Sequence, residues 1–152
     1  MVTFDSSVTI KRSPDEVFAY VMEPSNEPTW HEDVVGVKRT SDGVIGVGST
    51  FEWTMKFMGT HRVQMEVKEF VQGRRAVISA VSSGQLMPTL TYKFEQVSGG
   101  TTFSRHGDIR VGGVVRLIEP VMKVIAPKHM QGLLEKLKLV LEDAADKQKT
   151  RS

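Results

Sequence analysis

Apolar and polar residues alternate through the middle of this chain, between residues 34 and 111. Residues 50–57, 62–68 and 90–95 show the alternation most clearly, with one face apolar and the other polar or charged. Such strands are typical of an antiparallel sheet that is exposed to water on one side. Short turn-forming segments separate the runs and suit hairpins: Asp42-Gly43, Gly59, Gln72-Gly73, Ser83-Gly84 and Gly99-Gly100. The pattern therefore predicts a meander of about six strands.

A strand and two short helices are predicted ahead of this meander. Residues 3–10 also alternate and predict a first strand. A helix is predicted to follow Ser13, because its hydroxyl can cap the first turn and Pro14 suits the first helical position. Pro24 ends that helix, and a second short helix is predicted from Ser25 to about Trp30.

The apolar period becomes helical after Gly112-Gly113. One stripe contains Val114, Leu117, Ile118, Val121, Ile125, Met130, Leu133, Leu134, Leu137 and Leu141. Proline inside a helix removes a hydrogen bond and clashes with the preceding turn, so we expect a break or kink near Ala126-Pro127. A long final helix is then predicted to about Ala145. Because the apolar sheet face and the apolar helix stripe must cover each other, the sequence predicts an α+β fold.

The size and composition of the chain indicate its domain organisation. With 152 residues and a mass of 16.9 kDa it has the size of one domain. We expect a single domain over residues 1–147 and a frayed tail at 148–152. Apolar residues make up 39% and charged residues 25%, which argues against disorder. The absence of cysteine excludes a disulfide framework, a thiol nucleophile and a thiolate metal site, and it fits a cytoplasmic location.

The charge balance and the apolar segments argue against several kinds of partner. Twenty Lys and Arg against 18 Asp and Glu give a net charge of +2, without the concentrated basic face expected for nucleic acid binding. No apolar stretch reaches the roughly 20 residues of a membrane-spanning helix. Residues 1–5 lack the features of a secretory signal. We therefore expect no nucleic acid partner and no integral membrane segment, and the oligomeric state stays open.

Familiar catalytic and metal-binding motifs are absent from the sequence. Residues 31–35 read His-Glu-Asp-Val-Val and begin like a zinc-protease helix, but Val35 stands where the second histidine is required. The four histidines are scattered along the chain at His31, His61, His106 and His129. There is no Gly-x-Ser-x-Gly elbow, and the glycines at 43, 46 and 48 precede a strand rather than a helix. No metal and no cofactor are predicted.

Several short segments together resemble the helix-grip superfamily. They are residues 10–21, Glu23-Pro24, Trp30, the glycines at 43, 46 and 48 before Phe51, residues 92–95, residues 100–102 and residues 133–138. This superfamily contains the birch-pollen allergen fold, START lipid-transfer domains and the polyketide cyclase/dehydrase-like (SRPBCC) proteins, and the chain looks most similar to the last group. The resemblance implies a curved antiparallel sheet of about seven strands wrapped around the C-terminal helix, with a cavity between them. It implies no shared catalytic signature, since members bind or process many hydrophobic small molecules.

The inner faces of the sheet and of the final helix supply the candidate cavity residues. The full set is Trp30, Phe51, Trp53, Met55, Met65, Tyr92, Phe94, Arg105, Met122, Ile125, Met130 and Leu134. Each apolar member can be either plain core or cavity wall. Methionine is adaptable and suits a pocket that accepts varied apolar shapes. Trp30 can border the cavity mouth or pack under the sheet edge, and the Tyr92 hydroxyl can bond a ligand or a neighbouring side chain.

Arg105 is a charged residue that the alternation places on the inner face. It shares the face of Phe103, Gly107 and Ile109. An unpaired buried charge is very costly, so an inward Arg105 needs a partner. We hypothesise that it anchors a carboxylate or another polar end of a mostly apolar ligand. The alternatives are an internal partner such as Glu69, or a bulge near Gly107 that turns the side chain outward.

The leading functional hypothesis is binding of a hydrophobic small molecule, such as a lipid, an isoprenoid or a polyketide, between the sheet and the final helix. The alternative is a polyketide cyclase, aromatase or dehydratase that uses the same cavity. A protein-interaction module is the third possibility. The interior of the folded protein distinguishes these three hypotheses. A cavity with an acid/base pair favours the enzyme, a cavity without such a pair favours the carrier, and a packed core favours the interaction module.

Overall fold

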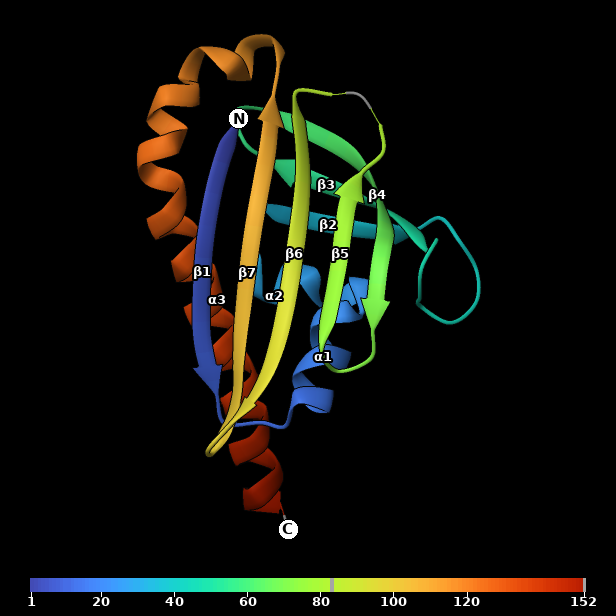
Figure 1. The fold of residues 1–152 in the computed structure, drawn as a ribbon, viewed down its shortest axis with the longest axis vertical. Coiled ribbons are helices and arrows are strands. Elements are labelled where there is room, and N and C mark those ends of the chain that lie inside the picture. Colours follow the sequence, from blue (N-terminus) through green and yellow to red (C-terminus); the bar gives the residue numbers. More distant parts are fainter. Residues whose placement is uncertain (83, 152) are drawn as a thin grey trace.

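Seven strands form one antiparallel sheet, and the long C-terminal helix α3 (Glu119–Arg151) lies against it (Figure 1). The computed structural model describes the backbone of residues 1–82 and 84–151, and the side chains of residues 1–82 and 84–143. The strands are β1 (Val2–Ile10), β2 (Val34–Arg39), β3 (Thr50–Lys56), β4 (Thr60–Val71), β5 (Arg75–Ala80), β6 (Leu86–Val97) and β7 (Gly100–Val111). Their order across the sheet is β1-β7-β6-β5-β4-β3-β2. The predicted six-strand meander and the α+β helix-grip fold are therefore confirmed.

Tight turns join β4 to β5 and β6 to β7 where the sequence predicts them, but residues 40–49 form a longer loop between β2 and β3, so the short hairpin predicted at Asp42-Gly43 is wrong. Gly73 between β4 and β5 and Gly99 between β6 and β7 have φ angles of +72° and +84°. Residues other than glycine rarely adopt this left-handed conformation, which explains the glycine at both turns. Ser83 of the predicted Ser83-Gly84 turn lies outside the described residues.

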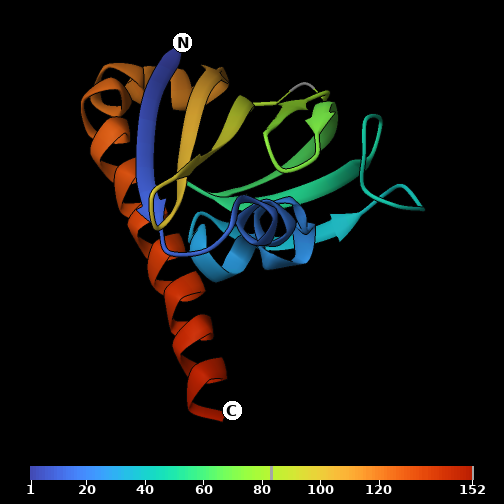
Figure 2. The same cartoon turned by 60° about the horizontal axis from the view of Figure 1, so that its bottom comes forward.

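Two short helices, α1 (Pro14–Met22) and α2 (Glu27–Trp30), connect β1 to β2 as predicted. The Ser13 hydroxyl accepts a hydrogen bond of 3.3 Å from the amide of Glu16, and Pro14 occupies the first helical position. One 3-10 turn, η1 (Pro24–Asn26), separates the helices. Figure 2 shows both helices on the side of the curved sheet that α3 also covers. The short helices therefore close part of the sheet's inner face.

Helix α3 runs without interruption through Pro127, so a break there is wrong, and the alternative of a kink stays a prediction. Pro127 is exposed, and so is Lys123, whose carbonyl would accept the missing amide hydrogen bond. Water can hydrate that carbonyl, which removes part of the cost of the lost bond. The helix also extends past the predicted end near Ala145. The side chains of the predicted frayed tail, 148–152, lie outside the described residues, and the single domain over 1–147 stays a prediction.

Three residues in the first part of the predicted apolar stripe face solvent, which corrects the expectation that they pack on the sheet. Val114, Leu117 and Val121 are 60%, 81% and 56% exposed. The first two belong to a 3-10 helix, η2 (Gly113–Ile118), which precedes α3. Its three residues per turn rotate the side chains relative to an α-helical stripe. The second part of the stripe is buried as predicted, at Leu133, Leu134, Leu137 and Leu141.

The core lies between the inner face of the sheet and the helices. Its largest fully buried side chains include Trp30, Trp53 and Tyr92. Phe4 of β1 pairs directly with Gly107 of β7. A Cβ atom at residue 107 would lie only 2.2 Å from Cε1 of the Phe4 ring. The missing side chain at Gly107 therefore makes room for the ring of Phe4.

Candidate functional site

An apolar cavity of about 190 Å³ lies between helix α3 and one end of the sheet. Its apolar wall consists of Met55, Phe57, Leu86, Pro88, Ile109, Met122, Ile125, Ala126 and Met130. The polar residues in this wall are Asp33 and His129. Since the sheet strands and α3 both contribute, the cavity occupies the position that the sequence predicts for a ligand site.

The structure divides the twelve candidate cavity residues into three groups. The first group lines this cavity and contains Met55, Met122, Ile125 and Met130. The second group lines a smaller cavity of about 10 Å³, roughly the size of one water molecule, and contains Phe51, Trp53 and Tyr92. The third group is buried or partly buried in the core and lines neither cavity: Trp30, Met65, Phe94, Arg105 and Leu134. A role in ligand binding stays a prediction for all twelve.

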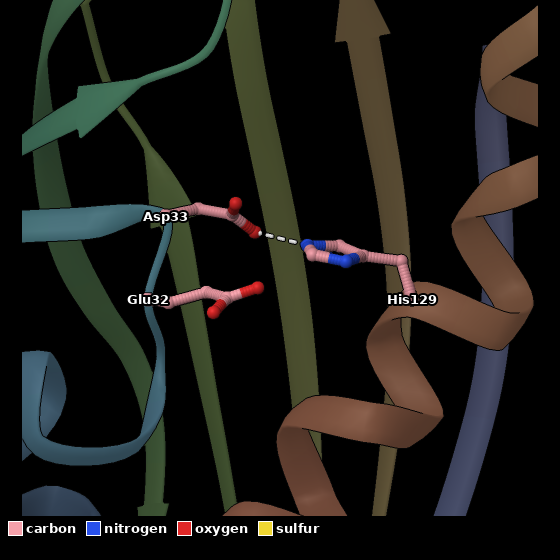
Figure 3. Close-up of side chains that lie close together, drawn as sticks. All are labelled: Glu32, Asp33 and His129. Atoms are coloured by element: carbon pink, nitrogen blue, oxygen red, sulfur yellow. Dashed lines mark hydrogen bonds and ion pairs between the residues drawn. The ribbon is translucent and has the colours of Figure 1, made fainter.

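Asp33 and His129 form the polar end of the larger cavity. Asp33 lies in the short segment between α2 and β2, and His129 lies in the first half of α3. Nε2 of His129 is 2.7 Å from Oδ2 of Asp33, which is hydrogen-bond distance (Figure 3). The carboxylate of Glu32 faces the same point, and one donor atom from each of the three residues lies within 4.8 Å of the others. The sequence analysis did not predict that these three side chains lie together, because His129 is far from Glu32 and Asp33 along the chain.

His31 lies next to this group and is buried, with 1% of its surface exposed. Its Nδ1 is 3.0 Å from Oε1 of Glu27, one helical turn earlier, and its Nε2 is 3.7 Å from Oδ2 of Asp33. Burial lowers the pKa of His31, and the positive charge of Arg105 lowers it further. The imidazole is therefore neutral near pH 7, and its Nδ1–H donates to Glu27.

Arg105 points into the protein, as the alternation predicts, and is 2% exposed. Its guanidinium lies 5.4 Å from the ring centroids of both Phe4 and Trp30. Among the described side chains, no carboxylate lies within 4.0 Å of it. Both alternatives are wrong: Glu69 bonds Arg75 instead, at 2.9 Å, and the pairing of β6 with β7 continues without a bulge through residue 107.

Trp30 and Tyr92 are part of the core around Arg105 rather than of the larger cavity. Trp30 is fully buried and stacks on the ring of His31, so it packs under the sheet and does not border the cavity mouth. The Tyr92 hydroxyl has no hydrogen-bond partner among the described residues. Burial raises the pKa of Tyr92, so this hydroxyl stays protonated at physiological pH.

Sequence reasoning missed several residues of the cavity wall. Phe57 and Ile109 share the inner face of strands that the alternation identified, so the period of two could have included them. Ala126 lies one turn from Met122 and Met130 and could have been found by helical period. Asp33 had no such signal, since it lies in a connecting segment.

A comparison with protein-family models places this sequence in a known family. The family model described as "Polyketide cyclase / dehydrase and lipid transport" matches residues 1–142. The chain belongs to this family. No curated protein matches the sequence.

Solved structures share the fold of this polyketide cyclase/dehydrase and lipid transport family member at low sequence identity. A START superfamily protein from Mycobacterium smegmatis is 14% identical, with a TM-score of 0.78 over 93% of this chain and 98% of that chain. A protein from Thermus thermophilus is 15% identical, with a TM-score of 0.77 over the same shares of the two chains. The di-domain ARO/CYC StfQ from the steffimycin biosynthetic pathway is 16% identical, with a TM-score of 0.73 over 95% of this chain and 52% of that chain.

Across the described residues, no helix combines the length and the apolar composition that crossing a membrane would require.

Proposed function

We propose that this family member binds a hydrophobic small molecule, such as a lipid, an isoprenoid or a polyketide-like compound, in the cavity between the sheet and α3. The observation that carries the proposal is the cavity itself, whose wall is apolar apart from Asp33 and His129. Apolar ligand surface moved from water into such a wall gains about 25 cal/mol per Å² before ordering costs. The family description, which includes lipid transport, supports the same conclusion.

Flexible side chains in the wall suit a ligand larger than the cavity. Typical ligand pockets measure roughly 300–1,000 Å³, and this cavity is about 190 Å³. Met55, Met122 and Met130 line it, and methionine changes its rotamer at low cost. We expect these three side chains to move apart when a ligand enters.

Asp33 and His129 are the groups that we expect to orient the ligand. Arg105 and Tyr92, the polar contacts that the sequence suggested, do not line the larger cavity. The carboxylate of Asp33 and the imidazole of His129 can each bond a hydroxyl or carbonyl oxygen of a ligand, directly or through the shared proton. Orientation by this pair would therefore favour ligands with one polar end.

Native mass spectrometry of gently purified protein, followed by solvent extraction, tests the binding proposal. We expect an added mass that survives gentle ionisation and disappears on denaturation. Ala126→Phe places a ring in the cavity and should abolish the added mass, because Ala126 is in the wall and almost fully buried. Ala19→Phe is the matched control, since Ala19 is exposed on α1.

Either of two results would count against binding in this cavity. The first is that the Ala126→Phe protein carries the same mass as the unchanged protein. The second is that no mass is found, and that neither oleate nor a short-chain isoprenoid quinone binds when added to the delipidated protein.

An enzyme of the cyclase, aromatase or dehydratase type is the second candidate. The observation that favours it is the hydrogen-bonded Asp33–His129 pair in the wall of an apolar cavity. General acid–base catalysis needs such a pair within reach of the substrate. Incubation with a poly-β-ketoacyl thioester should then give a cyclised or dehydrated product that His129→Gln abolishes. If the substrate stays unchanged through prolonged incubation, the enzyme proposal is refuted and the carrier proposal remains.

The interaction module predicts a filled interior and an exposed apolar patch. The exposed side chains of Val114, Leu117 and Val121 fit the second expectation, but the cavity of about 190 Å³ does not fit the first. A cytoplasmic location and the absence of a nucleic acid partner stay predictions from the sequence.

A further inference from the structure

Three potential metal ligands from two distant parts of the chain meet at the polar end of the cavity. One donor atom each from Glu32, Asp33 and His129 lies within 4.8 Å of the other two (Figure 3). Three atoms bound to one ion at about 2.1 Å and equally far from one another lie at most about 3.6 Å apart. Binding therefore requires the donor atoms to approach one another by roughly 1 Å, and the exposed Glu32 side chain is free to move.

A second histidine faces the same carboxylate from inside the protein. Nε2 of His31 is buried, has no hydrogen-bond partner among the described residues and lies 3.7 Å from Oδ2 of Asp33. That distance is too long for a hydrogen bond, so Nε2 is a buried and unpartnered polar atom at the edge of the cluster. Glu27 lies on the other side of the ring, with Oε1 3.0 Å from Nδ1 of His31.

We propose that Glu32, Asp33 and His129 form a binding site for a divalent transition-metal ion such as zinc or iron(II), with the buried Nε2 of His31 beside the Asp33 carboxylate. One imidazole and two carboxylates are a mixed nitrogen and oxygen set, which such ions prefer and which magnesium and calcium do not. Because Asp33 and His129 also line the apolar cavity, the ion would lie beside any molecule held there. It could then polarise a carbonyl or hydroxyl oxygen of that molecule. The inference does not depend on ligand binding in the cavity.

His106 shows that a histidine between two carboxylates is not enough for such a site. On the outer face of the sheet, its Nδ1 is 2.7 Å from Asp5 and its Nε2 is 3.2 Å from Asp108. The two carboxylates contact opposite nitrogens of one ring, so they cannot converge on a single ion. Their hydrogen bonds raise the pKa of His106, which favours the protonated form that binds no metal. His106 is therefore a matched control.

Metal titration of untagged, delipidated protein after treatment with a chelator tests this site. Isothermal calorimetry with zinc chloride should show one equivalent bound in the micromolar range or tighter. Cobalt(II) should give visible absorption bands typical of mixed nitrogen and oxygen coordination. His129→Gln and Asp33→Asn should each weaken zinc binding by about tenfold or more, and His106→Gln should leave it unchanged.

Glu32→Gln keeps the test valid if a variant of a buried residue fails to fold. Glu32 is exposed, so this variant should keep the circular dichroism spectrum of the unchanged protein while zinc affinity falls severalfold. The proposal is overturned if the unchanged protein binds neither zinc nor cobalt(II). It is also overturned if His106→Gln weakens binding as much as His129→Gln does. Because the titration uses delipidated protein, its result is independent of whether the cavity holds an apolar ligand.

Discussion

Gly107→Ala should destabilise the protein, because the added methyl group would collide with the ring of Phe4. The added Cβ would lie 2.2 Å from Cε1 and 2.3 Å from Cζ of Phe4, where ordinary contact begins at 3.4 Å. The ring must therefore move by more than 1 Å within the core, where Phe4 is almost fully buried and supports the Arg105 guanidinium. Overpacking of this kind costs about 1–3 kcal/mol. The φ angle of Gly107 is not positive, so the cost comes from the contact and not from the backbone.

Urea denaturation followed by tryptophan fluorescence measures this cost, since Trp30 and Trp53 are both buried. Gly107→Ala should lower the urea midpoint without changing the slope of the transition. Gly132→Ala in α3 is the matched control, because no atom lies within 4 Å of its added Cβ. That variant should gain about 0.5–1 kcal/mol from the better helix propensity of alanine. If Gly107→Ala unfolds at the midpoint of the unchanged protein, or if both variants shift in the same direction, the packing argument is refuted.

Three further predictions concern the helix cap, a surface histidine and the buried arginine. Ser13→Ala should lower the free energy of unfolding by about 1 kcal/mol, because the first turn of α1 loses its side-chain acceptor; Ser13→Asp, which can still cap, should not. The folded-state pKa of His106 is raised above 6.5 by Asp5 and Asp108, so its stabilising effect is present below pH 6.5 and is lost as the pH rises through that pKa. His106→Gln should therefore destabilise the protein more at pH 5.5 than at pH 8.5 in urea titrations, and an equal effect at both values would contradict this. Arg105→Met should bind the cavity ligand with unchanged affinity in mass spectrometric titrations, because the residue does not line that cavity; a tenfold loss would restore its anchoring role.

The strand faces could be predicted from the sequence because side chains on a strand alternate with a period of two. Trp53 and Met65 are buried as that period requires, and the same parity placed Arg105 inside the protein. The helix stripe was predicted correctly from Leu133 onward, in the part of α3 that packs on the sheet. At η2 the backbone changes to three residues per turn, and Leu117 then faces solvent.

The polar end of the cavity could not be predicted, because it depends on tertiary structure alone. Asp33 and His129 are 96 positions apart, and they meet because α3 packs against α2, just ahead of Asp33 in the chain. Asp33 lies in a connecting segment, so no period marks its direction. His31 has a local partner in Glu27, and the spacing of four residues could have suggested that contact, but its burial depends on the whole fold.

The pairing of β1 with β7 has a consequence for the order of events during synthesis. Val2 pairs with Ile109, so β1 leaves the ribosome before a partner strand that is made more than a hundred residues later. At about 5–20 residues per second, this wait lasts roughly 5–20 s. Throughout that time the nascent chain carries a strand edge that can pair with other chains. The polar outer face of β1, with Thr3, Asp5 and Ser7, would limit such pairing until β7 has emerged.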